Sequence, residues 1–196
     1  MPPIHLAGRH YSSLNLVSAY DFDRTRLILV SGGQVRKGFP MELLLDALLE
    51  WIGDHSSYDT QNVPLPIVLQ LSPEELTREF YTGVAHLMPD DGVDERINAL
   101  YAATDGPHGT IYLLSAHQYD ESETFDQPMD NPLWREVLLH ELVHHVQWQS
   151  GDAEQWQCAA QGEFEAYMLG GRYLKQLAVA DLMPNRNFWG MIYSRC

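Results

Sequence analysis

The segment Leu138–Gln147, with the sequence LLHELVHHVQ, limits the possible folds of this chain more than any other stretch. Its apolar residues recur at the spacing of an α-helix, and proline is absent from its interior. The positions that form the apolar stripe of this helix are Leu139, Leu142, Val143 and Val146. The segment therefore predicts a helix that packs this stripe against the core of the fold.

The polar residues of the same helix have the order H-E-x-x-H, formed by His140, Glu141 and His144. Residues i and i+4 lie on one helix face, so both imidazoles can reach one metal ion. Glu141 points about 100° around the helix, where it can bind a water on the metal rather than the metal itself. Zinc lowers the pKa of such a water to about 7, and a glutamate can accept its proton. The motif predicts a Zn²⁺ site with Glu141 as general base.

Three other interpretations of the motif are weaker or excluded. A buried structural pair of histidines would need no metal, and it stays an alternative. Di-iron bundles use Glu-x-x-His twice, and Glu141–His144 has no second copy in the chain. The metzincin extension requires glycine and histidine where this chain has Gln147 and Ser150, so that class is excluded.

A zinc site of this kind needs a third protein ligand and an open position for water. The segment Gln161–Leu174, QGEFEAYMLGGRYL, offers two carboxylates, Glu163 and Glu165. The inward stripe that we predict for its helix is Ala160, Phe164, Tyr167, Gly171, Leu174 and Ala178. Glu163 falls about 60° from the centre of this stripe and Glu165 about 140°. The helical phase favours Glu163 as the ligand and places Glu165 toward water, although Glu165 as ligand or as partner of a ligand remains open.

The other segments predict an α+β domain, in which a small mixed sheet is backed by helices. The expected strands are Thr25–Gly33, Leu65–Leu71 and a pair within Ala99–Leu114. The expected helices are Phe39–Gly53, one that starts at a Ser72 capping box, one from Asn131-Pro132 to Ser150-Gly151, and one over Ala153–Ala180 with a weak spot at Gly170-Gly171. An acidic surface loop is expected over Tyr119–Pro132.

We expect residues 1–196 to form a single domain with a core of about 39–180. Residues 1–38 would be an N-terminal extension and 181–196 a C-terminal tail. The two cysteines, Cys158 and Cys196, do not make a disulfide framework. We favour two unpaired thiols, with a single tie between the tail and a helix as the alternative. The aromatic tail Asn187–Cys196 can also fold over the cleft, where Cys196 would take the open zinc position.

The composition of the chain argues against some classes of binding partner. The formal net charge of −15 argues against nucleic acid and against anionic membranes. No stretch has the length of a transmembrane helix. The opening Met1–His10 has no apolar signal region, which predicts a cytoplasmic protein, or a secreted one if a leader has been removed.

The motifs HELVHH and EFEAY together resemble those of the gluzincin zinc metallopeptidases, especially the minigluzincins and similar short bacterial proteins of unassigned function. The resemblance covers about Thr110–Leu174. It implies an active-site helix followed by a glutamate helix, zinc held by His140, His144 and Glu163, and a peptide or protein substrate. Glu141 would act as general base and then as acid. Tyr167 stands where the family commonly has an aspartate that orients a ligand histidine, so the orienting group is unassigned.

The resemblance also implies that Gly109–Leu114 is the sheet edge that pairs with an extended substrate, with an ordinary edge strand as the alternative. The tyrosines that could donate to an oxyanion are Tyr112, Tyr167, Tyr173 and Tyr193. A zinc metallopeptidase is the main hypothesis. The alternatives are a zinc-binding module without turnover, self-inhibited or regulatory, and a metal-dependent hydrolase of a non-peptide amide.

Overall fold

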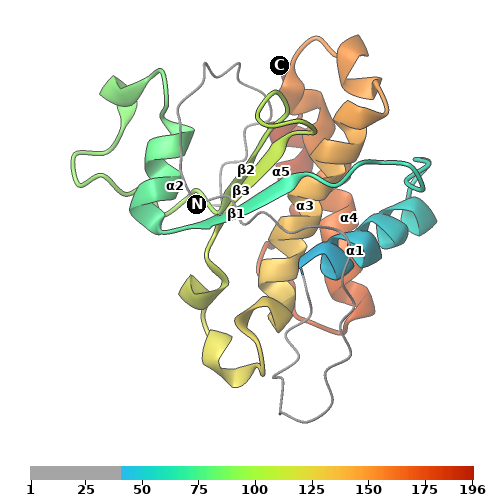
Figure 1. Cartoon of the computed structure of the whole chain (residues 1–196), viewed down its shortest axis with the longest axis horizontal. Coiled ribbons are helices and arrows are strands. Elements are labelled where there is room, and N and C mark those ends of the chain that lie inside the picture. The colour runs from blue at the N-terminus through green and yellow to red at the C-terminus, as the bar shows by residue number, and fades with distance from the viewer. Residues whose placement is uncertain (1–40) are drawn as a thin grey trace.

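The computed structural model of the chain describes residues 41–196. In these residues, five α-helices surround a three-stranded mixed sheet (Figure 1), which confirms the predicted α+β class. The helices are α1 (Met41–His55), α2 (Pro73–Phe80), α3 (Pro132–Gln149), α4 (Glu163–Gln176) and α5 (Arg186–Tyr193). The strands are β1 (Ile67–Leu71), β2 (Ala99–Ala102) and β3 (Thr110–Leu114). The predicted strand at Thr25–Gly33 lies outside the described residues.

The sheet has the order β1-β3-β2. The expected strand pair is confirmed, because β2 runs antiparallel to β3 with Ala99 opposite Leu113. The expectation that β3 is a sheet edge is wrong, because β1 pairs with its other side in parallel. Within residues 41–196, the two edge strands are therefore β1 and β2.

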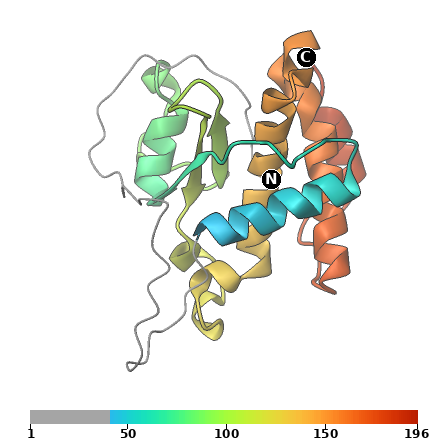
Figure 2. The ribbon, with the colours of Figure 1, turned by 45° about the vertical axis from the view of Figure 1, so that its right-hand side comes forward.

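Helices cover both faces of this sheet (Figure 2). On one face α2 packs Leu76 against Leu100 of β2 and Tyr112 of β3. On the other face Ile111 and Leu113 of β3 join the larger core formed with α1, α3 and α4. Alternate residues of each strand thus belong to different layers, as expected for a strand covered on both sides.

Two local signals act as expected. The Ser72 side chain accepts a hydrogen bond from the Glu75 amide, and the Glu75 side chain accepts one from the Ser72 amide, which completes the capping box of α2. At the start of α3 the Asn131 side chain accepts from the Leu133 amide at 2.9 Å, directly before Pro132. Helix α1 differs slightly, because it continues to His55 instead of ending at Gly53.

Helix α3 lies at the centre of the molecule. Every residue from Val137 to Gln147 is buried, so the helix packs on all sides rather than along one stripe. At its first turn Trp134 is fully buried and its indole N–H donates to the carbonyl of Leu114 at 3.0 Å. The polar side chains of α3 therefore have to find their partners inside the protein.

The helix predicted over Ala153–Ala180 is much shorter in the structure. Two short 3₁₀ turns, Asp152–Gln155 and Ala159–Gly162, precede α4, and α4 ends at Gln176. The predicted stripe is also wrong in part, because Phe164 and Ala178 are exposed. The residues that form the buried face are Glu163, Ala166, Tyr167, Leu169, Gly170, Tyr173 and Leu174.

The expected weak spot at Gly170-Gly171 is not a break in α4, which continues through both glycines. A Cβ atom at Gly170 would lie 2.1 Å from a carboxylate oxygen of Glu136 on α3. A Cβ atom at Gly171 would lie 2.7 Å from the side chain of Arg186, the first residue of α5. The two glycines therefore allow α3 and α5 to approach α4 closely.

The C-terminal tail is held against α4 in two ways. Gly190 of α5 packs beside Phe164 and Tyr167 of α4. Cys196 forms a disulfide with Cys158, so the expectation of unpaired thiols is wrong and the tie is correct. A sulfur engaged in a disulfide is not available as a thiolate ligand, which also excludes Cys196 from the zinc position.

Removing this disulfide should lower the stability of the fold. Its cysteines are 38 residues apart, and the entropy of closing such a loop in the unfolded chain corresponds to about 4 kcal/mol. We expect Cys196→Ser to lose up to about this amount in urea unfolding. Wild-type protein treated with a reductant should match the variant. Equal stability of oxidised wild type and Cys196→Ser would contradict the prediction.

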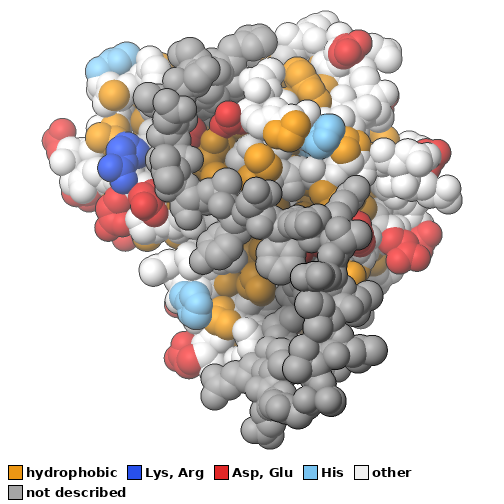
Figure 3. All heavy atoms as spheres, viewed as in Figure 1, with side chains coloured by type: hydrophobic (Ala, Val, Ile, Leu, Met, Phe, Trp, Pro, Cys, Tyr) orange, Lys and Arg blue, Asp and Glu red, His pale blue; other side chains and the backbone are white. Residues whose placement is uncertain are grey.

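The surface of the described residues carries scattered carboxylates. On the face in Figure 3, acidic side chains occur at several places, whereas the coloured Lys and Arg side chains gather at one. This agrees with the net charge of −15, which attracts cations at long range. No helix within residues 41–196 is both long and apolar enough to span a bilayer.

Candidate metal centre

The three predicted ligands meet in the interior. The Nε2 atoms of His140 and His144 lie 3.2 Å apart. The carboxylate of Glu163 reaches both, at 3.2 Å from His140 Nε2 and 3.5 Å from His144 Nε2. One ligand atom from each residue lies within 4.8 Å of the others, and all three residues are buried. The first residue of α4 thus completes a cluster begun by one turn of α3.

This cluster fits a metal ion. Glu163 is only 1% exposed, and its Oε1 atom has no hydrogen-bond partner among residues 41–196. A buried carboxylate is costly unless a cation or hydrogen-bond donors compensate its charge. Two imidazole nitrogens with one carboxylate oxygen form a donor set that suits Zn²⁺ and related transition metals better than Ca²⁺ or Mg²⁺.

The electrostatics of the centre also favour a bound cation. Burial alone would raise the pKa of Glu163, but the two imidazoles overcome it and hold that pKa well below its usual range. Burial disfavours the charged form of His144, yet the adjacent Glu163 raises the pKa of His144 to about 9. The site therefore stabilises positive charge beside Glu163, and a divalent cation would supply that charge.

Packing holds the ring of His140. Tyr167 lies edge-to-face against this ring, with centroids 4.8 Å apart. On its other side Tyr167 stacks on Tyr193 of α5 at 5.8 Å. Tyr167 thus contacts the first histidine as an aromatic ring, and Tyr193 of the tail stacks on Tyr167.

A hydrogen-bonded chain leads away from the second histidine. Gln147 Oε1 lies 2.9 Å from His144 Nδ1. Gln147 Nε2 donates to the carbonyl of Gly162 and to Glu165 Oε2, both at 3.1 Å. The hydroxyl of Tyr58 donates to the same Glu165 oxygen at 2.8 Å. Glu165 is therefore half-buried and hydrogen bonded, so the prediction that it faces water is wrong, and it is linked to His144 through Gln147.

The neighbouring histidine, His145, has a different role. Its Nε2 donates to the carbonyl of Pro64 at 2.7 Å, and its Nδ1 lies 3.1 Å from the hydroxyl of Tyr101. Burial lowers the pKa of His145 to about 4. His145 is therefore a neutral tie between α3, β2 and the segment before β1, and it stays outside the ligand set.

The tyrosines considered as oxyanion donors differ in whether they lie near the metal centre. Tyr112 packs on the α2 face of the sheet and donates to Asp105, and Tyr173 packs against Trp51 of α1. Tyr167 contacts the ring of His140, and Tyr193 stacks on Tyr167. Tyr119, which no sequence signal indicated, is half-buried; its hydroxyl is buried near Glu136 and Glu141, and no described residue hydrogen bonds to it.

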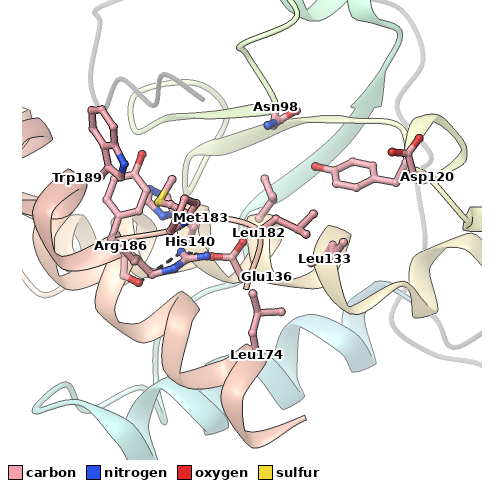
Figure 4. A pocket seen from close by; sticks show the side chains of 14 residues that line it. Asn98, Asp120, Leu133, Glu136, His140, Leu174, Leu182, Met183, Arg186 and Trp189 are labelled. Atoms are coloured by element: carbon pink, nitrogen blue, oxygen red, sulfur yellow. Dashed lines mark hydrogen bonds and ion pairs between the residues drawn. The ribbon is translucent and has the colours of Figure 1, made fainter. Parts of the chain in front are cut away.

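A cavity of about 560 Å³ opens beside His140 (Figure 4). Asn98 and Asp120 lie on one side of it, and Arg186 and Trp189 of α5 lie on the other. Its apolar lining includes Leu133, Val137, Leu174, Leu182 and Met183. The tail therefore builds one wall of the cavity instead of closing it. This volume is in the range of small-molecule and side-chain pockets.

An ion-pair network anchors that wall. Arg186 donates to Glu136 of α3 at 2.7 Å and to both oxygens of Asp181 at 2.7 and 2.8 Å. Two carboxylates thus offset the single guanidinium. Arg186 has little capacity left to bind an anionic ligand in the cavity.

Comparison with known proteins identifies the family. No curated protein matches the chain, and no solved structure does. The family described as "Domain of unknown function (DUF6647)" matches residues 37–194. This match covers most of the sequence, including both helices of the metal centre, so the chain belongs to the DUF6647 family.

Proposed function

We propose that this protein is a zinc-dependent metallopeptidase. The observation that carries the proposal is the buried convergence of His140, His144 and Glu163, with Glu141 on the same turn of α3. Bound zinc supplies a Lewis acid and lowers the pKa of a water molecule. A structural zinc site would be closed by a fourth protein ligand, whereas the described residues contribute three to this cluster.

Residues of the chain transfer the proton and bind the substrate. Glu141 accepts the proton of the attacking water and then delivers it to the leaving amine. The cavity beside His140 receives a side chain of the substrate next to the bond that breaks. Because its lining is mainly apolar and Arg186 is already paired, a neutral side chain is favoured over an acidic one.

The sheet supports a peptide as substrate. With β3 in the centre, the edge role that the resemblance gives to β3 passes to β2, which packs beside α3. Asn98, directly before β2, lines the cavity. An extended peptide that adds to this edge would gain main-chain hydrogen bonds while one of its side chains enters the cavity.

Burial favours a second candidate, a zinc-binding module without turnover. His140, Glu141, His144 and Glu163 are each at most 3% exposed, which restricts access to the centre. Hydrolysis of a non-peptide amide would use the same residues. Only turnover assays on defined substrates separate these functions.

Purified protein, prepared without chelators, should contain about one zinc ion per chain by elemental analysis. It should cleave an unfolded, fluorescently labelled protein, and removal of the metal should abolish the cleavage. Absence of zinc, together with no binding of added zinc, would refute the metal centre. Zinc without cleavage would favour the binding module.

A further inference from the structure

The amide of Gln147 has one defined orientation. Its Nε2 atom lies 3.1 Å from the main-chain carbonyl oxygen of Gly162, which can only accept a hydrogen bond. The second contact of Nε2, also at 3.1 Å, is a carboxylate oxygen of Glu165. The NH₂ group of the amide must face these two oxygens, so the carbonyl oxygen of the amide faces His144.

This orientation fixes the tautomer of His144. The oxygen of an amide can only accept, and Oε1 of Gln147 lies 2.9 Å from His144 Nδ1. A metal-bound ring keeps one proton, and that proton must therefore be on Nδ1, so that the Nε2 lone pair beside His140 and Glu163 can bind the ion. A neutral histidine side chain in water prefers the other tautomer, in which that lone pair is protonated.

The surroundings keep the amide in place. Gln147 is only 1% exposed, and Tyr58 donates to the oxygen of Glu165 that the amide contacts. A Cβ atom at Gly162 would lie 2.5 Å from Gln147 Oε1 and 2.6 Å from the ring of Trp156. Only glycine at this position leaves the space that the amide occupies. A buried amide with its polar atoms hydrogen bonded is rigid.

We propose that Gln147 is the positioning residue of the metal centre, which holds His144 as an Nε2 ligand, and that Glu165 and Tyr58 orient Gln147. The proposal rests on the metal binding of the proposed function but not on hydrolysis. Helix α3 thus supplies the orienting group three residues after the ligand, since residues i and i+3 are neighbours on a helix. Gln147 would therefore be the group that orients a ligand histidine, a role that stayed unassigned from the sequence because Tyr167 stands where an aspartate was expected.

The test compares zinc affinities by competition with a chelator. Gln147→Met keeps the size of the side chain and removes the acceptor, and we expect it to bind zinc about 10–100-fold more weakly. Glu165→Gln leaves the amide of Gln147 in place, so its loss should be smaller. The matched control is Gln149→Met on the same helix, whose amide donates to the carbonyl of His108 and which should bind zinc like the wild type.

Two further measurements separate positioning from general stability. Cobalt-substituted Gln147→Met should show an altered visible spectrum, whereas Gln149→Met should match the wild type. In zinc-loaded wild type, nitrogen NMR of the histidine rings should find a proton on His144 Nδ1, a result that does not depend on any variant folding.

The outcomes are distinct. Equal zinc affinity of Gln147→Met and wild type, or a proton on His144 Nε2, would overturn the role of Gln147 while leaving the metal centre intact. Wild type that binds no divalent metal would overturn both. Zinc binding without peptide cleavage would count against the peptidase alone, and the affinity comparison would still decide the role of Gln147.

Discussion

Glu163→Ala is expected to weaken zinc binding by roughly 10³-fold, because zinc sites bind with about 10–16 kcal/mol shared among a few ligands. Glu163 is the only carboxylate in the cluster, and its loss leaves two neutral imidazoles. The variant removes a buried charge along with a ligand, so it should fold without metal. Chelator competition, followed by elemental analysis, measures the loss.

The matched control for this variant is Glu165→Ala, two residues further along the same helix. Its carboxylate contacts Gln147 and Tyr58 rather than the histidine nitrogens of the cluster. We expect it to retain zinc, with a loss of about 100-fold at most. If Glu165→Ala lost its metal and Glu163→Ala kept it, the ligand role would belong to Glu165.

Glu141→Gln is expected to retain zinc and to lower hydrolysis by about 10²–10⁴-fold, the usual contribution of a general base. Glu141 is buried on the same turn as the ligands but is not part of the ligand cluster. Glutamine has almost the same shape and cannot accept a proton. Cleavage of a labelled unfolded protein and zinc content should be measured on one preparation. Turnover equal to wild type would refute the assignment of Glu141.

Much of the helical frame could be predicted because its signals are local. Asn131-Pro132 begins α3, and the Ser72 capping box begins α2, since each of these signals acts within one helical turn. The H-E-x-x-H spacing likewise depends only on the geometry of one helix. These features need no knowledge of the rest of the fold.

The features that could not be predicted depend on contacts between distant segments. The start of α4 depends on Gly162, whose environment is set by Gln147 and Trp156. The chain of hydrogen bonds behind His144 ends at Tyr58, 107 residues before its partner Glu165. Sequence periodicity describes residues within one helix or strand, so it cannot predict either of these contacts between distant segments.

Glu163 lies beside both histidines, as predicted, although the argument for that position was incomplete. We chose it over Glu165 by its angle to a stripe that includes Phe164, yet Phe164 is 39% exposed. The buried face of α4 is rotated toward Glu163, which makes Glu163 part of that face instead of its neighbour. The error comes from including the exposed Phe164 and the half-buried Gly171 in the stripe while leaving out buried residues of the same helix, namely Ala166, Leu169, Gly170 and Tyr173.

The disulfide has a consequence for proteolysis. It encloses α4, the exposed segment 177–185 and α5 in one covalent ring. A single backbone cut in that segment, for example beside the 73% exposed Leu182, would leave both fragments attached to each other. Such a nicked chain would migrate as one species without reductant and as two with it. If the protein cleaves peptide bonds, a cut in its own tail would not release α5 from the cavity wall that it builds.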